Sequence, residues 1–296
     1  MRIAILALLL AAASATASAA TLDRVKETGH LRLGYLTNAR PLTFRGGESG
    51  PPDGYGIALC RRIVEAVETR LGQGRIEVQW VPVELGRHLA EIQQGNIDLL
   101  CTPTAETVAR REQVSYSIPV FPAGLRAVLR NDASGALRDA LSQKPSTSPV
   151  WRGTPAARLL QQTKFAVVSG TVWESWVAER RKSLQIDATI VPVPDHRAGL
   201  RALVDGKADV FFADRALALG AMDETISKEV YVFDQLYTRD PLFLAVARED
   251  ADFRLLVDRT LSETYSSAEF ASLYAKWCGP FDEDTRAFFE WVTLMP

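Results

Sequence analysis

The sequence predicts an α/β protein of two lobes, each built on a mixed β-sheet with helices on its faces. Segments with strand and helix periodicity alternate as strand, helix, strand, helix, strand between residues 30 and 100, and the same order returns between 164 and 214. Long extended stretches at 117–130 and 230–249 follow the two sets. Two like halves joined by two such stretches indicate similar lobes between which the chain crosses twice.

The first set begins with the alternating segment HLRLGYL at 30–36, which is typical of a strand. In the stretch 54–72, apolar residues recur at every fourth position from Leu59 to Leu71, with charged residues between them. This spacing predicts an amphipathic helix. The strand 76–83, a further helix and the apolar segment NIDLL complete the set.

Residues 131–163 are rich in Ser, Pro and Ala, and we interpret them as a surface excursion with a weak helical patch. The second set follows as KFAVVSG, VWESWVAERRKSL, ATIVPV, HRAGLRALVDG and ADVFFAD. Amphipathic helices are expected at about 250–265 and 267–277, before a short acidic tail, and they can return to pack on the first lobe. The expected boundaries are lobe 1 at 21–121 plus 246–296 and lobe 2 at 122–245.

Composition limits the classes of function. The chain has 296 residues, of which 47% are hydrophobic, so a large core can form. Its formal net charge of −2 offers no face for a polyanion, and we expect no nucleic-acid partner. The cysteine spacing does not fit a zinc site, and the sequence has no GxSxG, HExxH, P-loop or dinucleotide-binding motif. We therefore expect no metal, no cofactor and no catalytic activity.

Residues 1–20 are typical of a secretory signal peptide rather than of a folded segment. A positive start at Met1-Arg2 precedes the apolar run IAILALLLAAA and the small residues SATASAA, which predicts cleavage after Ala19 or Ala20. Export permits disulfides, but three cysteines leave at least one thiol unpaired. We interpret the cysteines as small buried hydrophobic residues with one bridge at most.

Open α/β sheets bind ligands at the carboxyl ends of their strands, so we expect 101–110 and 212–214 to line a cleft between the lobes. Arg110 and Arg111 follow the first of these strands, and a guanidinium can hold a carboxylate through two parallel hydrogen bonds. The residues alone leave open which arginine points inward and whether both simply end a helix. Nearby hydroxyls belong to Thr102, Thr104 and Thr107.

Further candidates lie in the second half of the chain. Asp214 follows an apolar strand and could bind a ligand's ammonium group or cap a helix. Gly170 and Thr171 lie between a strand and a helix, where a helix N-terminus favours an anion, although the pair alone is a weak signal. His196 starts a helix and could reach the cleft, whereas His88 is expected at the surface or in packing.

An ordered set of segments resembles the bacterial periplasmic amino-acid-binding proteins of ABC importers, extracellular solute-binding family 3. The resemblance covers nearly the whole chain after the first twenty residues, and its specificity comes from the order and spacing of modest motifs. They are HLRLGYLTNARPLTF, DGYGIALCRRIVEAV, GNIDLLCTPTAETVARREQVSYSIPVF, FAVVSGTVWESW, GKADVFFADRALAL and LYAKWCG. The resemblance implies the type II periplasmic-binding-protein fold, with two crossing strands as the hinge.

The resemblance also implies roles for residues. The family's α-carboxylate arginine lies six residues before an FS motif, which YS matches here, so the clamp falls on Arg110. The family's ammonium-binding aspartate closes the strand after a GK-D motif, which gives Asp214. Its second-lobe G-T turn matches Gly170 and Thr171.

Within the family the chain looks most similar to the glutamate/aspartate-binding branch. Arg87 and His196 match the two positions that this branch uses for the ligand's side-chain carboxylate. The chain departs from the branch elsewhere, because Leu36 stands in place of an arginine, Ala105 of a threonine and Glu84 of a serine. The expected ligand-binding residues are Arg110, Asp214, Thr104, Thr107, Thr171, Gly170, Arg87 and His196.

The resemblance predicts a monomeric periplasmic protein that closes two lobes on a free amino acid, polar or acidic in its side chain, and delivers it to the membrane permease of an ABC transporter. One alternative is a periplasmic enzyme on the same fold, similar to cyclohexadienyl or arogenate dehydratases, with Glu84 or His196 as the general acid. Another is a sensor or binding protein outside transport. Turnover of prephenate or arogenate would identify the enzyme.

Overall fold

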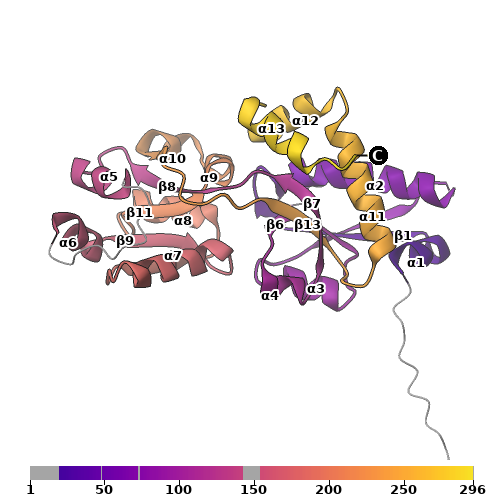
Figure 1. Ribbon diagram of the computed structural model, residues 1–296, viewed down its shortest axis with the longest axis horizontal. Coiled ribbons are helices and arrows are strands. Elements are labelled where there is room, and N and C mark those ends of the chain that lie inside the picture. Colours follow the sequence, from indigo (N-terminus) through magenta and orange to yellow (C-terminus); the bar gives the residue numbers. More distant parts are fainter. Residues whose placement is uncertain (1–19, 48, 73, 143–153, 296) are drawn as a thin grey trace, which may run out of the picture.

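The computed structural model describes residues 20–47, 49–72, 74–142 and 154–295. In this part of the chain two lobes lie side by side, joined by two extended segments (Figure 1). The expected signal peptide lies outside the described residues except for Ala20. None of the described helices has the length and apolar character that crossing a membrane requires.

Lobe 1 is built on a five-stranded sheet with the order β5-β1-β6-β13-β7. The strands β1 (His30–Tyr35), β5 (Glu77–Pro82) and β6 (Leu99–Ala105) are parallel. Strand β13 (Leu242–Val246) runs antiparallel to both of its neighbours, β6 and β7 (Ser115–Phe121). A small second sheet consists of β2 (Asn38–Ala39), β3 (Thr43–Arg45) and β4 (Pro52–Asp53).

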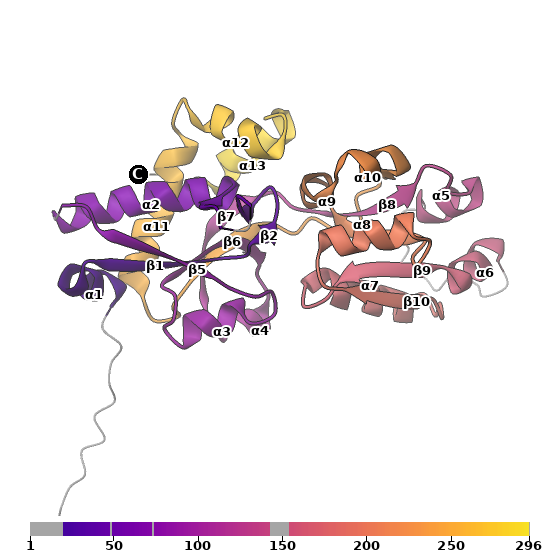
Figure 2. The ribbon, with the colours of Figure 1, turned by 180° about the vertical axis from the view of Figure 1, so that it is seen from behind.

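Helices cover both faces of the first sheet, and the last three of the chain return to this lobe (Figures 1 and 2). The helices are α1 (Thr21–Thr28), α2 (Tyr55–Leu71), α3 (His88–Gln93), α4 (Val108–Arg111), α11 (Ala251–Tyr265), α12 (Phe270–Cys278) and α13 (Glu283–Val292). Residues of β6 alternate between two cores: Leu99 packs in the cluster that contains Ile63 of α2, whereas Leu100 packs with Leu89 of α3. Burial on both faces explains why the first three residues of this strand, Leu99 to Cys101, are all apolar.

Lobe 2 repeats the same plan with the strand order β10-β9-β11-β8-β12. Its strands are β8 (Leu125–Arg130), β9 (Lys164–Val168), β10 (Thr189–Val193), β11 (Val210–Asp214) and β12 (Val230–Val232). Strands β10, β9 and β11 are parallel, and β8 pairs antiparallel with β11 and β12. The helices are α5 (Gly135–Ser142), α6 (Pro155–Gln162), α7 (Val172–Ser183), α8 (His196–Val204), α9 (Arg215–Ala221) and α10 (Glu224–Glu229). The predicted fold class of two mixed α/β lobes is therefore confirmed.

Three segments differ from the sequence-based expectation. The tail folds as α13, because Asp282 caps the helix and Phe289 packs against Phe270 with 4.6 Å between the ring centroids. Two helices, α5 and α6, lie within the expected surface excursion, whose residues 143–153 are outside the described part of the chain. The return strand begins at Leu242, so the chain re-enters the first sheet a few residues before the boundary expected at 245.

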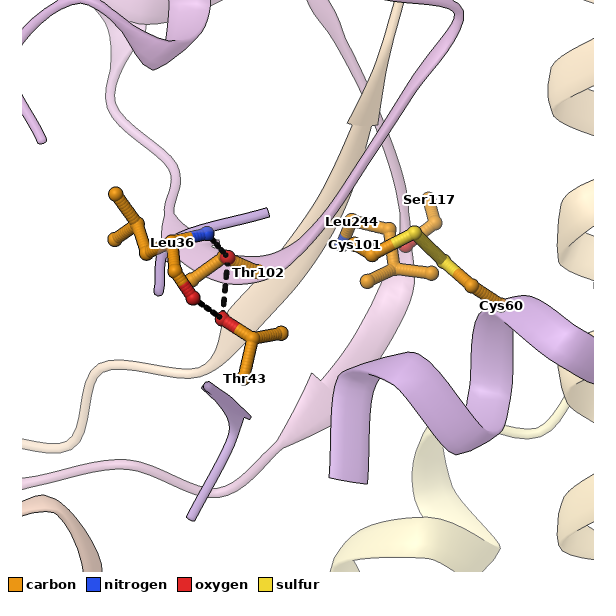
Figure 3. Close-up of a disulfide and its surroundings, with 7 residues drawn as sticks. All are labelled: Leu36, Thr43, Cys60, Cys101, Thr102, Ser117 and Leu244. Carbon is orange, nitrogen blue, oxygen red and sulfur yellow. Dashed lines mark hydrogen bonds between the residues drawn. A yellow bond between two sulfur atoms is a disulfide. The ribbon is translucent and has the colours of Figure 1, made fainter. Parts of the chain in front are cut away.

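One disulfide joins the two layers of lobe 1. Cys60 of α2 and Cys101 of β6 are both buried and bonded to each other (Figure 3), whereas the thiol of Cys278 is free. Cys60 and Cys101 agree with the expectation of buried cysteines with one bridge at most, whereas Cys278 is half-buried. The bond fixes α2 against the strand whose next residues reach the cleft between the lobes.

Candidate functional site

A cavity of about 320 Å³ lies between the lobes, at the carboxyl ends of their parallel strands. Lobe 1 contributes residues 36–39, 83–85 and 102–105 together with Arg110, and lobe 2 contributes residues 170–173 and 194–196. Five of the expected ligand-binding residues line this cavity. They are Thr104, Arg110, Gly170, Thr171 and His196.

Arg110 directs its guanidinium at this cavity. Thr107 caps α4 by accepting the Arg110 N–H at 3.1 Å, which sets the start of the helix. The Nη1 atom donates to the carbonyl of Ala105 at 2.8 Å and to Oγ1 of Thr104 at 3.4 Å, and Nη2 donates across the cleft to the carbonyl of Gly170 at 3.1 Å. All these acceptors are neutral, and burial lowers the pKa of Arg110. A half-buried cation without a counter-ion among the described residues favours an anionic ligand.

Arg111 faces solvent instead. It is exposed and forms an ion pair with Glu106, whose hydrogen bond raises the pKa of Arg111. The sequence alone left open which of the two arginines points inward. The structure brings Arg110 to the cavity and leaves Arg111 at the surface.

Thr104 connects Arg110 to His88, a residue that we expected at the surface or in packing. The His88 ring is buried, with Nδ1 accepting the Gly86 N–H at 3.2 Å and Nε2 lying 3.4 Å from Oγ1 of Thr104. Since Nδ1 is an acceptor, the proton of the neutral ring belongs on Nε2 and is donated to Thr104. Burial first, and then the charge of Arg110, lower the pKa of His88 to about 4. The hydroxyl of Thr104 thus accepts from two donors and keeps its own proton for a ligand.

Gly170 and Thr171 form the edge of lobe 2 opposite Arg110. Gly170 has a φ of 77°, a left-handed conformation that favours glycine, and its carbonyl accepts from Arg110. Thr171 caps α7 through the Glu174 N–H at 3.4 Å and donates to the Val168 carbonyl at 2.7 Å. The turn therefore places the Gly170 carbonyl at the cavity, next to the N-terminus of α7, while the Gly170 N–H donates to the Glu174 carboxylate at 2.9 Å.

His196 and its neighbour Asp195 approach the cavity from the start of α8. His196 is 9% exposed, and its Nε2 atom has no hydrogen-bond partner among the described residues. Burial lowers the pKa of His196 to about 4. Asp195 caps α8 through the Ala198 N–H at 2.8 Å and accepts from Asn38 of lobe 1 at 3.2 Å. We did not single out Asp195 and Asn38 from the sequence, although each follows the carboxyl end of a parallel strand.

Asp214 lies elsewhere. Its carboxylate is 5% exposed, caps α9 through the N–H groups of Ala216 and Leu217, and accepts the Gly124 N–H at 3.0 Å. It lines a different hollow, together with residues 121–124 of the first crossing segment and Tyr274 of α12. Burial raises the pKa of Asp214. The structure therefore does not place Asp214 on the wall of the cavity that Arg110 lines.

Two further expected residues stand outside the cavity lining. Thr107 acts through the cap of α4 that positions Arg110. Arg87 is exposed at the start of α3, next to the cleft but not on the cavity wall. Its neighbour Glu84 does line the cavity.

A small network fixes the wall of the cavity in lobe 1 (Figure 3). Thr102 accepts the Leu36 N–H at 2.8 Å, Thr43 donates to the Leu36 carbonyl at 2.9 Å, and the two hydroxyls lie 2.7 Å apart. All these atoms are buried, so the network is fully paired without water. It holds the apolar side chain of Leu36 against the cavity, where the glutamate/aspartate-binding branch is expected to carry an arginine.

Comparisons with known proteins identify the family of this chain. Residues 31–280 match the model of the bacterial extracellular solute-binding proteins, family 3. The L-glutamate/L-aspartate-binding protein of Pseudomonas aeruginosa is 27% identical over 87% of this chain and 79% of its own length. The glutamate/aspartate import solute-binding protein of Escherichia coli is 24% identical over 93% of this chain and 86% of its own length.

Solved structures share the fold. The ancestral amino-acid-binding protein AncCDT-1, a precursor of cyclohexadienyl dehydratase, aligns with a TM-score of 0.70 at 22% identity over 88% of this chain and 100% of its own. The cysteine-binding protein of Campylobacter jejuni aligns with a TM-score of 0.67 at 20% identity over 87% and 92%. Because the family match spans nearly all of the chain that follows the N-terminal segment, this protein belongs to the bacterial extracellular solute-binding proteins of family 3.

Proposed function

We propose that this protein is the solute-binding component of an ABC-type importer and closes its two lobes on a free amino acid. The observation that carries the proposal is Arg110, a half-buried cation in the interlobe cavity whose hydrogen-bond acceptors among the described residues are all neutral. The α-carboxylate of an amino acid can replace the Gly170 carbonyl as its acceptor and form two parallel hydrogen bonds.

In this proposal the ammonium group of the ligand contacts a carboxylate of lobe 2. Asp195 lines the same cavity, and the Asn38 amide that it accepts is exposed and can be replaced by an ammonium group. In this proposal Asp195 takes the role that the resemblance implied for Asp214. A zwitterion between Arg110 and Asp195 contacts both lobes at once, and this favours the closed arrangement over an open one.

Isothermal titration with the twenty amino acids tests the proposal, using Arg110→Ala and Arg111→Ala as a matched pair. Loss of a buried charged partner costs binding about 2–5 kcal/mol, so we expect Arg110→Ala to weaken the tightest ligand by roughly 30-fold or more. Arg111 pairs with Glu106 at the surface, and its alanine variant should stay within a few-fold of the wild type. An unchanged dissociation constant in Arg110→Ala would contradict the proposed carboxylate clamp.

We further propose that residues 1–20 are a signal peptide, that cleavage near Ala19 or Ala20 releases a monomeric protein into the periplasm, and that its partner is a membrane permease. The family match and the names of the relatives support this proposal. Intact mass of the protein recovered from the periplasm of an expressing bacterium tests the cleavage site. Retention of the full N-terminus would contradict it.

The enzymatic alternative has less support from the cavity. A dehydratase needs a general acid beside the leaving hydroxyl, and His196, with a pKa lowered to about 4, is neutral at pH 7. Incubation with prephenate or arogenate tests this alternative directly. Product formed by the purified protein, and lost with His196→Gln or Glu84→Gln, would favour the enzyme over the binding protein.

A further inference from the structure

The charges of the interlobe cavity are unequal. One cation, Arg110, lines it, together with two carboxylates, Glu84 and Asp195. The His196 ring adds no charge near neutral pH, since burial holds its pKa at about 4. A zwitterion gripped at its α-carboxylate by Arg110 and at its ammonium by Asp195 uses one charge of each sign. Glu84 then remains for the ligand's side chain.

Glu84 keeps its negative charge available to that side chain. It is exposed on the cavity wall, and its carboxylate forms no hydrogen bond or ion pair with another described residue. Arg87, three residues on, lies off the cavity wall. Leu36 contributes an apolar side chain to the same wall. No second cation of the described residues lines the cavity to receive a second carboxylate.

We infer, on the basis of the proposed function, that the cavity selects amino acids with a single carboxylate, whose side chain is uncharged or cationic, and that Glu84 is the residue that rejects acidic side chains. Two of the curated relatives to which this chain is similar carry glutamate and aspartate in their names. This chain therefore departs from them in ligand class while keeping the fold. Like charges brought together in a partly enclosed cavity repel more strongly than in water, so a dicarboxylic ligand loses affinity.

Two pairs of nearly isosteric ligands isolate the charge: glutamine against glutamate and asparagine against aspartate. Titration at neutral pH should give each acid a dissociation constant at least about tenfold higher than that of its amide. Replacing Glu84→Gln should lower this ratio by about fivefold or more, because the repulsive carboxylate is removed while the volume is kept. The control Glu91→Gln alters a carboxylate of α3 that bonds Asn96 outside the cavity, and it should leave the ratio unchanged.

The outcomes separate this inference from the proposed function. Binding of neutral or basic amino acids with the acids at least tenfold weaker supports both. Glutamate binding tighter than glutamine, with that preference lost in Arg87→Gln, would assign the second carboxylate to Arg87 and overturn the inference alone. A ratio that Glu84→Gln does not change would also overturn it. Absence of binding by all twenty amino acids would overturn the proposed function and the inference with it.

Discussion

Acidification should destabilise the protein through two histidines that are buried next to the cavity. His88 and His196 each have a folded-state pKa of about 4, lowered from 6.5 chiefly by burial, and for His88 also by Arg110. Above pH 6.5 neither the folded nor the unfolded chain protonates these rings, and their contribution to stability is fully present. Between pH 6.5 and pH 4 only the unfolded chain takes up the protons, so stability falls as the pH falls through this window.

The expected loss is large relative to the stability of a typical domain. One unit of pKa difference between the two states corresponds to about 1.36 kcal/mol, so each ring costs about 3 kcal/mol when the pH has dropped below 4. Native proteins have roughly 5–15 kcal/mol to lose. The two histidines together can therefore account for much of the acid sensitivity of this protein.

Denaturant unfolding at about pH 7.5 and about pH 4.5 measures the effect, with wild type compared against His88→Gln and His196→Gln. Carboxylates also titrate in this range, so the useful quantity is the difference between wild type and variant in the stability lost on acidification. Each variant should lose about 2–3 kcal/mol less than the wild type. Equal losses in wild type and variant would show that the ring is not held neutral in the folded state, and would refute the reasoning for that histidine.

Two further predictions concern stability. Reducing or removing the disulfide between Cys60 and Cys101, which spans 41 residues, should lower the unfolding free energy by about 2–4 kcal/mol. The control Cys278→Ser breaks no bond and should change this free energy little. Equal effects of the two changes in urea unfolding would contradict a structural role for the disulfide. Gly56→Ala places a Cβ 2.1 Å from the Cys101 carbonyl oxygen and should lower the unfolding free energy by about 1–3 kcal/mol. In the control Gly135→Ala the new Cβ meets no atom within 4 Å, and stability should be unchanged or slightly higher. A melting temperature unchanged by Gly56→Ala would contradict the close approach of α2 to β6.

The fold was predictable because the spacing of apolar residues within a segment indicates which of its faces is buried. The first three residues of β6 and the first four of β11 are continuous apolar runs, as expected for strands covered by helices on both faces. The stretch 54–72, predicted as a helix from its amphipathic pattern, matches α2 to within one residue at each end. The tail was harder, because α13 depends on aromatic contacts with α12 that the acidic composition of its first turn does not reveal.

The site was predictable only where a local signal sets the direction of a side chain. Adjacent residues of a helix point about 100° apart, so Arg110 and Arg111 could not both face the cleft, but their order depends on the Thr107 cap and on the partner Glu106. His88 gave no local signal, since its partner Thr104 lies on another element. The sequence around Asp214 was compatible with an ammonium site or with a helix cap. The structure shows the cap, and the N–H of Gly124, 90 residues away in the chain, is a further donor to this carboxylate.

The proposed use of Asp195 in place of Asp214 bears on how a ligand could drive closure. A ligand shifts the equilibrium between open and closed lobes only through contacts that differ between the two states. Asp214 accepts hydrogen bonds from Gly124 in the crossing segment and from its own helix, so these contacts lie at the hinge. The bonds of Arg110 to Gly170 and of Asn38 to Asp195 instead join one lobe to the other. A bound zwitterion replaces these two bonds, each between a charged and a neutral group, by bonds between charged groups. The free energy of binding is therefore gained at the faces that meet on closure, where it can change the population of the closed state.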